Sequence, residues 1–139
     1  MDENKPLNWS PQPGLGYAVT RRPDGGLTVT FHDLSDQTLA DWREFAFAHL
    51  LDSDRLTRNL YDLRELSEIP EKAIKVAVEV NSDPSTRNLR VGVLVAGESA
   101  HQAVARVASG VAGGGAAIRI FTSIEEAEAW LKKPLDQII

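Results

Sequence analysis

The chain lacks cysteine altogether, and it has one methionine among 139 residues. Without cysteine there can be no disulfide, no thiolate nucleophile, no iron–sulfur cluster and no cysteine-bound zinc. No apolar run approaches the roughly 20 residues of a membrane-spanning helix. Basic residues are also in deficit, with 15 against 20 acidic ones. A net charge of -5 gives no attraction to phosphates, so we expect no nucleic-acid partner and no membrane insertion.

What is present is typical of one soluble domain. The chain is 42% hydrophobic and 25% charged, and its length fits a single core. Residues 1–15 hold three prolines and predict an extended arm, residues 16–133 form the domain, and residues 134–139 form a short apolar tail. The polar, acidic start lacks the apolar core of a secretory signal, so a cytoplasmic location is expected.

The pattern of residues predicts an alternation of strands and helices. Two β-rich runs, residues 17–20 and 27–31, flank a Pro-Asp-Gly turn and indicate a hairpin. The later elements are a helix capped by Asp33 or Ser35, a strand at 59–63, a helix opened by Pro70, an apolar strand at 89–96, a helix capped by Ser99, a strand at 117–121 and a helix capped by Ser123. This order, β-β-α-β-α-β-α-β-α, predicts a single-domain α/β fold with one mixed sheet and helices packed on it.

One segment fits two structures. Residues 73–80 alternate like a strand at Ile74, Val76 and Val78, yet Ala73 and Ala77 also satisfy helical spacing. The preceding Pro-Glu-Lys and the need for a crossover between parallel strands favour a helix.

The first helix suggests an interface. An ideal helical wheel places Leu39, Trp42 and Phe45 on one buried face. Phe47 and Leu51 fall among charged residues on the opposite face, so both are candidates for contact with a second copy, and a homodimer is expected. The alternative is the scattered exposure of single apolar side chains that is common in monomers.

No catalytic or metal-binding motif is recognised. His32, His49 and His101 lie on three elements without metal-ligand spacing, and no nucleophile elbow occurs. The glycine-rich stretch 110–115 ends a helix and precedes a strand, whereas a phosphate loop follows a strand and opens a helix. We therefore expect no metal, no cofactor and no enzymatic activity.

Ligands of open α/β sheets gather beyond the carboxyl ends of the strands. The candidate binding residues at those ends are Asp62, Arg64, Ser67, Glu98, Ser99 and His101. Their structural alternatives are an Asp62–Arg64 ion pair and helix capping by Ser99. The 62–67 loop precedes a helix N-terminus, where a phosphate or carboxylate would be stabilised. An enzyme would require Asp62, Glu98 and His101 to meet around one substrate.

Several phrases resemble the SpoIIAA-like branch of the STAS superfamily (sulfate transporter and anti-sigma factor antagonist domains). They are Tyr-Asp-Leu-Arg at 61–64, Leu-Arg-Val-Gly-Val-Leu-Val at 89–95, Ala-Arg at 105–106 and Phe-Thr-Ser-Ile-Glu-Glu-Ala-Glu-Ala-Trp-Leu at 121–131. The last phrase is the most specific. The resemblance covers residues 16–131.

The resemblance implies a STAS-like sheet and a non-enzymatic regulatory or protein-interaction role, with a partner that the sequence does not name. In anti-sigma factor antagonists the switch is a phosphorylated Ser or Thr in an Asp-Ser-Gly-like turn. Here Leu63 and Arg64 follow Asp62, and Ser67 is the nearest hydroxyl. The branch is also discussed alongside Sec14-type lipid-binding folds. The alternative function is therefore binding of a small apolar or anionic ligand at the strand ends.

Overall fold

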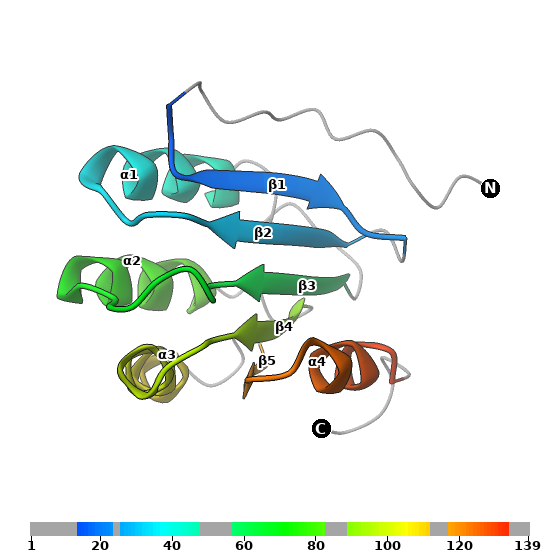
Figure 1. Cartoon of the computed structure of the whole chain (residues 1–139). Helices are drawn as coiled ribbons and strands as arrows, with labels where there is room; N and C mark the ends of the chain where they lie inside the picture. Colours follow the sequence, from blue (N-terminus) through cyan, green and yellow to red (C-terminus); the bar gives the residue numbers. More distant parts are fainter. Residues whose placement is uncertain (1–13, 24–25, 48–56, 83–88, 112–116, 134–139) are drawn as a thin grey trace.

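A five-stranded mixed sheet organises the chain (Figure 1). The structure is a computed structural model that describes residues 14–23, 26–47, 57–82, 89–111 and 117–133. The elements in chain order are β1 (Tyr17–Arg21), β2 (Leu27–Phe31), α1 (Asp36–Phe45), β3 (Thr57–Asp62), α2 (Glu71–Asn81), β4 (Leu89–Leu94), α3 (Glu98–Gly110), β5 (Ala117–Phe121) and α4 (Ile124–Leu131). The predicted α/β class and element order are confirmed, including the helix at the ambiguous segment.

The strands lie side by side in sequence order, β1-β2-β3-β4-β5. β1 and β2 pair antiparallel, with Tyr17 opposite Phe31, which confirms the hairpin. The other three junctions are parallel, because α1, α2 and α3 each return the chain to the start of the next strand. All carboxyl ends of β2 to β5 therefore face the same edge of the sheet.

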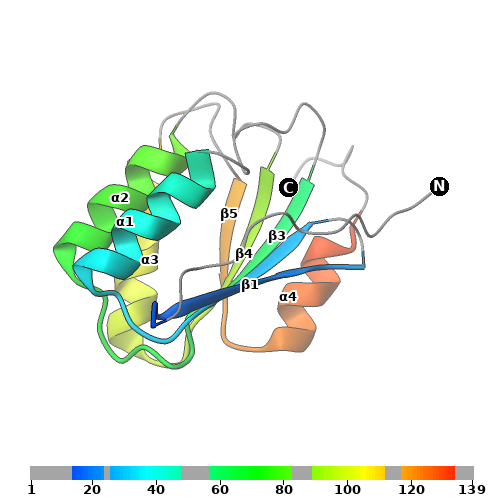
Figure 2. The same cartoon turned by 90° about the horizontal axis from the view of Figure 1, so that it is seen from above.

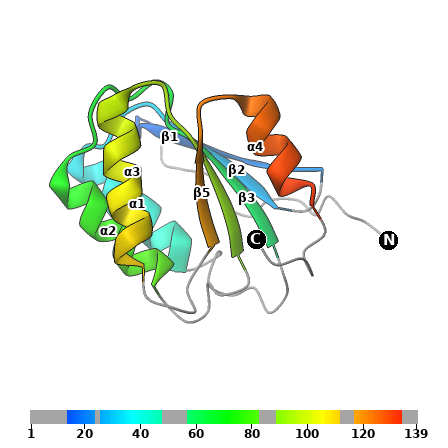
Figure 3. The same ribbon diagram turned by 90° about the horizontal axis from the view of Figure 1, so that it is seen from below.

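The helices cover the two faces of the sheet unequally. α1, α2 and α3 lie on one face, and α4 lies on the other (Figures 2 and 3). The main core cluster includes Phe31, Trp42 and Val93, while Leu94 packs beneath α4 with Trp130 in a second cluster. Side chains of β4 thus enter both clusters, which explains the nearly unbroken apolar run of that strand.

The helix caps confirm two predictions and correct two. Ser35 and Ser123 each accept a hydrogen bond from the backbone N–H three residues later, as predicted. Ser99 is not a cap: Gly97 occupies the extended cap position, and the helix begins at Glu98, so Ser99 lies in its first turn. Pro70 likewise takes the extended cap position, and its helix begins one residue later than expected.

The end of α1 changes the setting of Phe47. Residues 46–47 widen into a π-turn, which an ideal helical wheel does not include. Phe47 is half-buried and packs against the main cluster, with the Arg43 guanidinium 4.7 Å from its ring centroid. Leu51, the tail at 134–139 and nearly all of the predicted arm lie outside the described residues.

Candidate functional site

Asp62 and Arg64 form an ion pair at the carboxyl end of β3. The Arg64 Nε and Nη2 atoms donate to the two Asp62 carboxylate oxygens at 3.0 and 2.8 Å, and the Arg64 backbone N–H donates to Oδ1 at 3.1 Å. The Arg64 guanidinium holds the pKa of Asp62 below its usual range. The sequence left open whether Asp62 and Arg64 bind a ligand or pair with each other. In the structure the two side chains pair with each other.

Two other candidates meet in a polar groove. Ser67 and Ser99 both line an open groove of about 630 Å³ at the carboxyl edge of the sheet. His32 is also there, with its Nδ1 3.0 Å from Glu65 Oε2. The polar lining side chains are His32, Asp33, Glu65, Ser67, Glu68 and Ser99. Three carboxylates against one histidine disfavour a phosphate or carboxylate ligand in this groove.

The remaining candidates do not converge. Glu98 and His101 are exposed on α3, and Glu98 accepts a 3.4 Å hydrogen bond from Gln102. Within the described residues, no hydrogen bond joins Asp62, Glu98 and His101. That part of the chain also contains no group of three acidic or histidine side chains that could hold a metal ion. Its helices include none that is both long and apolar enough to cross a membrane.

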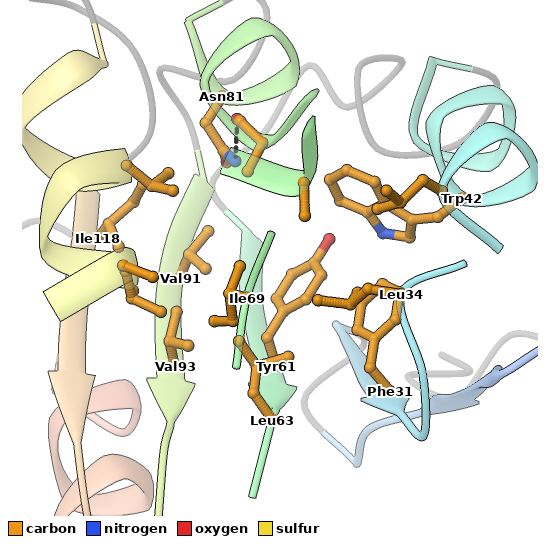
Figure 4. A pocket seen from close by; sticks show the side chains of 16 residues that line it. Phe31, Leu34, Trp42, Tyr61, Leu63, Ile69, Asn81, Val91, Val93 and Ile118 are labelled. Atoms are coloured by element: carbon orange, nitrogen blue, oxygen red, sulfur yellow. Dashed lines mark hydrogen bonds between the residues drawn. The ribbon is translucent and has the colours of Figure 1, made fainter. Parts of the chain in front are cut away.

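An apolar cavity of about 90 Å³ lies between the sheet and the three helices α1 to α3 (Figure 4). Its sheet wall consists of Phe31, Tyr61, Val91, Val93 and Ile118. Its helix wall consists of Leu39, Trp42, Ala73, Ala77, Asn81, Ala103, Val104 and Val107. Residues of the connecting segments, Leu34, Leu63 and Ile69, complete it.

The cavity follows from a mismatch of side-chain size. At one end, Trp42 stands edge-on to both Phe31 and Tyr61, with ring centroids 6.0 and 5.9 Å apart. These large rings keep α1 away from the sheet. Toward α2 and α3 the helix wall carries Ala73, Ala77 and Ala103, which are too short to fill the space. The space is therefore a consequence of this particular set of side chains.

Two polar groups face each other inside this apolar space (Figure 4). Trp42 is 5% exposed, and its buried indole N–H makes no hydrogen bond of standard length and angle among the described residues. Its polar neighbour is the Tyr61 hydroxyl: burial raises the pKa of that hydroxyl, and donation from the Trp42 indole toward its oxygen opposes the rise. Tyr61 is therefore protonated at any physiological pH. A buried donor without a well-formed hydrogen bond costs up to about 1–3 kcal/mol.

The cavity and the groove share two walls. Leu34 and Ile69 line both spaces, so the polar groove adjoins the apolar cavity. The third polar side chain of the cavity, Asn81, donates from Nδ2 to the Ala77 carbonyl at 2.8 Å. None of the described residues that line the cavity carries a charge. The cavity can therefore bind an uncharged, mainly apolar molecule.

No family model, curated protein or solved structure matches this chain. The sequence patterns point to the strand-end candidates and not to Trp42 and Tyr61, since Trp42 falls on the buried face of a predicted helix and Tyr61 lies within a predicted strand. The one available signal was the polar atom that each ring carries, because a buried Trp N–H or Tyr O–H usually requires a partner.

Proposed function

We propose that this protein is a non-enzymatic module that binds a small apolar ligand in the cavity beneath α1, α2 and α3. The observation that carries the proposal is the apolar cavity itself, at one end of which the buried Trp42 N–H makes no hydrogen bond of standard geometry and has the Tyr61 hydroxyl as its polar neighbour. An unfilled apolar cavity and a poorly paired donor both destabilise a fold. A ligand in this space would remove both costs at once, which gives the arrangement a function.

The test is a titration of the ¹⁵N-labelled protein with α-methylstyrene, an uncharged aromatic hydrocarbon, followed by NMR. We expect chemical-shift changes at residues that line the cavity. Ala77→Met places a longer side chain into the cavity from α2, while Ala129→Met makes the same change at an exposed position of α4. Binding should disappear in the first variant and persist in the second. Equal binding by both variants, or no binding by the wild type, would contradict the proposal.

A regulatory or protein-interaction role of the STAS-like type is the second candidate. The resemblance supports it, and so does the open groove at the carboxyl edge of the sheet, whose carboxylates include Glu65 and Glu68. Such a groove would favour a partner segment that presents lysine or arginine. Affinity capture with wild type and with Glu65→Lys/Glu68→Lys should lose that partner in the variant. Identical capture by both proteins would mean that the groove does not bind the partner.

Self-association is part of that second candidate. The homodimer prediction rests on Phe47 and Leu51, and Phe47 also supports the core. Light scattering should give the dimer mass for the wild type and for Phe47→Leu, which keeps an apolar side chain. Phe47→Asp should give the monomer mass, with circular dichroism to show that the variant is folded. An unchanged mass for folded Phe47→Asp would exclude Phe47 from any interface.

A further inference from the structure

Two hydrogen-bond donors converge in the cavity. The Trp42 indole can only donate, and the protonated Tyr61 hydroxyl can donate as well as accept. The two groups face each other across the aromatic end of the cavity (Figure 4), and their rings meet at 84° with centroids 5.9 Å apart. A single oxygen with two lone pairs between them could accept from both. A carbonyl oxygen has two lone pairs and no proton of its own, so it can accept both hydrogen bonds without needing an acceptor from this apolar site.

We propose that the ligand is a small, neutral, single-ring carbonyl compound whose oxygen accepts hydrogen bonds from Trp42 Nε1–H and Tyr61 O–H. This inference rests on the proposed function, because it names the chemical class that the same cavity selects. The ring lies toward the aliphatic end, against Val91, Val107 and Ile118. The carbonyl oxygen lies at the aromatic end.

Charge in the site selects a neutral ligand. The described lining residues include no lysine, arginine or histidine, so an ionised carboxylate would be desolvated without a counter-charge. The raised pKa of Tyr61 has the same cause, since the cavity disfavours a negative charge on the phenolic oxygen. A ketone or aldehyde oxygen carries only partial negative charge. It gains from both donors without that desolvation penalty.

Size and shape limit the ligand to one ring. The cavity of about 90 Å³ holds roughly six to nine water-sized groups at 10–15 Å³ each. A single substituted ring occupies such a space, and a fatty acyl chain or a nucleotide exceeds it. The alanines of α2 and α3 face the larger side chains of the sheet across the cavity, and this part of the space is where a ring would lie.

The experiment compares three ligands of nearly equal shape. Acetophenone carries the carbonyl, α-methylstyrene replaces its oxygen by a methylene group, and benzoate carries a full negative charge. We expect acetophenone to bind about five- to tenfold more tightly than α-methylstyrene, which is the effect of about one net hydrogen bond. Benzoate should bind more weakly than either. Acetophenone alone should also move the Trp42 indole N–H proton resonance downfield, because only acetophenone supplies an acceptor.

Two variants assign the effect to the two donors. Tyr61→Phe removes the hydroxyl with little change of shape, and Trp42→Phe removes the indole N–H and also identifies its resonance. The measured quantity is the ratio of the two affinities, acetophenone over α-methylstyrene, because that ratio is insensitive to altered cavity volume. It should fall toward one in Trp42→Phe and fall partly in Tyr61→Phe.

The possible outcomes distinguish a failure of the carbonyl inference from a failure of the proposed function. If α-methylstyrene binds but acetophenone has no advantage, the carbonyl inference is wrong and the apolar cavity remains a binding site. If benzoate binds best, the inference of a neutral ligand is wrong. If none of the three binds the wild-type protein, the proposed function itself fails. Retention of the full ratio in Trp42→Phe would show that the indole does not contact the oxygen.

Discussion

Gly16 lies where the chain enters β1, directly beside the loop that opens α1. Its N–H donates to the Thr38 hydroxyl at 3.0 Å, and its carbonyl accepts from the His32 N–H at 2.7 Å. A Cβ atom at this position would lie 2.1 Å from Asp33 Oδ2. The Asp33 carboxylate accepts from the Ser35 N–H and the Thr38 hydroxyl, so it would have to give up those bonds to make room.

Gly16→Ala is therefore expected to lower the free energy of unfolding by about 1–3 kcal/mol, measured by urea denaturation. Gly92→Ala is the matched control, because its Cβ would meet Leu131 Cδ1 at 3.5 Å, an ordinary van der Waals distance. The control should change stability by no more than about 1 kcal/mol, and a gain is expected from the reduced entropy of the unfolded chain. Equal losses in both variants would refute the role given to the Asp33 loop.

The binding residues are harder to predict than such structural contacts. Trp42 falls on the buried face of the helical wheel, and the structure confirms its burial; Tyr61 lies in a predicted strand, and its side chain is half-buried. Whether a ring packs fully or borders a cavity depends on the side chains that surround it. Here these include Ala73 and Ala77, which are distant in sequence from Trp42. No local pattern encodes this set of neighbours.

At the scale of the elements, ion pairs connect helices to the rest of the fold in two different environments. Arg22, just after β1, is 7% exposed and makes a two-pronged contact with Glu128 of α4 at 2.8 and 3.0 Å. Arg43 of α1 contacts Glu79 of α2 with similar geometry, at 2.7 and 2.8 Å, but both side chains are about half exposed. Equal geometry with unequal burial makes these pairs a direct comparison.

Glu128→Ala is expected to destabilise the protein by about 2 kcal/mol or more, because it leaves the buried Arg22 charge without this partner. Glu79→Ala is expected to cost no more than about 1 kcal/mol, since water screens both of its charges. Chemical denaturation of the two variants at low and at high salt gives the comparison. A larger loss for Glu79→Ala than for Glu128→Ala would contradict the importance assigned to burial.

The order of elements was predictable because each element carries its own periodicity or cap. In α2 the periodicity does not decide between helix and strand. Ile74 and Val80 are buried and Val76 and Val78 are half-buried, so apolar side chains lie on much of the circumference of the helix. Its helical state follows from the crossover requirement and not from its pattern. Ser99 is not the cap because the helix starts at Glu98, two residues before the start that a Ser99 cap would give, and Gly97 takes the extended conformation that precedes it.

At the scale of the whole molecule, the two faces of the sheet are covered differently. The apolar cavity lies on the face covered by α1, α2 and α3. α4 packs Trp130 and Leu131 against the sheet, and these side chains are 4% and 0% exposed. On the opposite face, α2 covers a cavity with two alanines. Tight packing on one face supplies stability, and the other face is left with room for a ligand. A protein selected for stability alone would have filled that room.

This difference predicts a trade-off between stability and binding. Ala77→Met should raise the free energy of unfolding by about 0.5–2 kcal/mol, since the thioether side chain fills apolar space and methionine tolerates a helix well. The same change should reduce the affinity for α-methylstyrene at least tenfold. Ala129→Met, on the exposed face of α4, should leave both quantities nearly unchanged. A variant Ala77→Met that loses stability and keeps the ligand would mean that the cavity is not the place where the ligand binds.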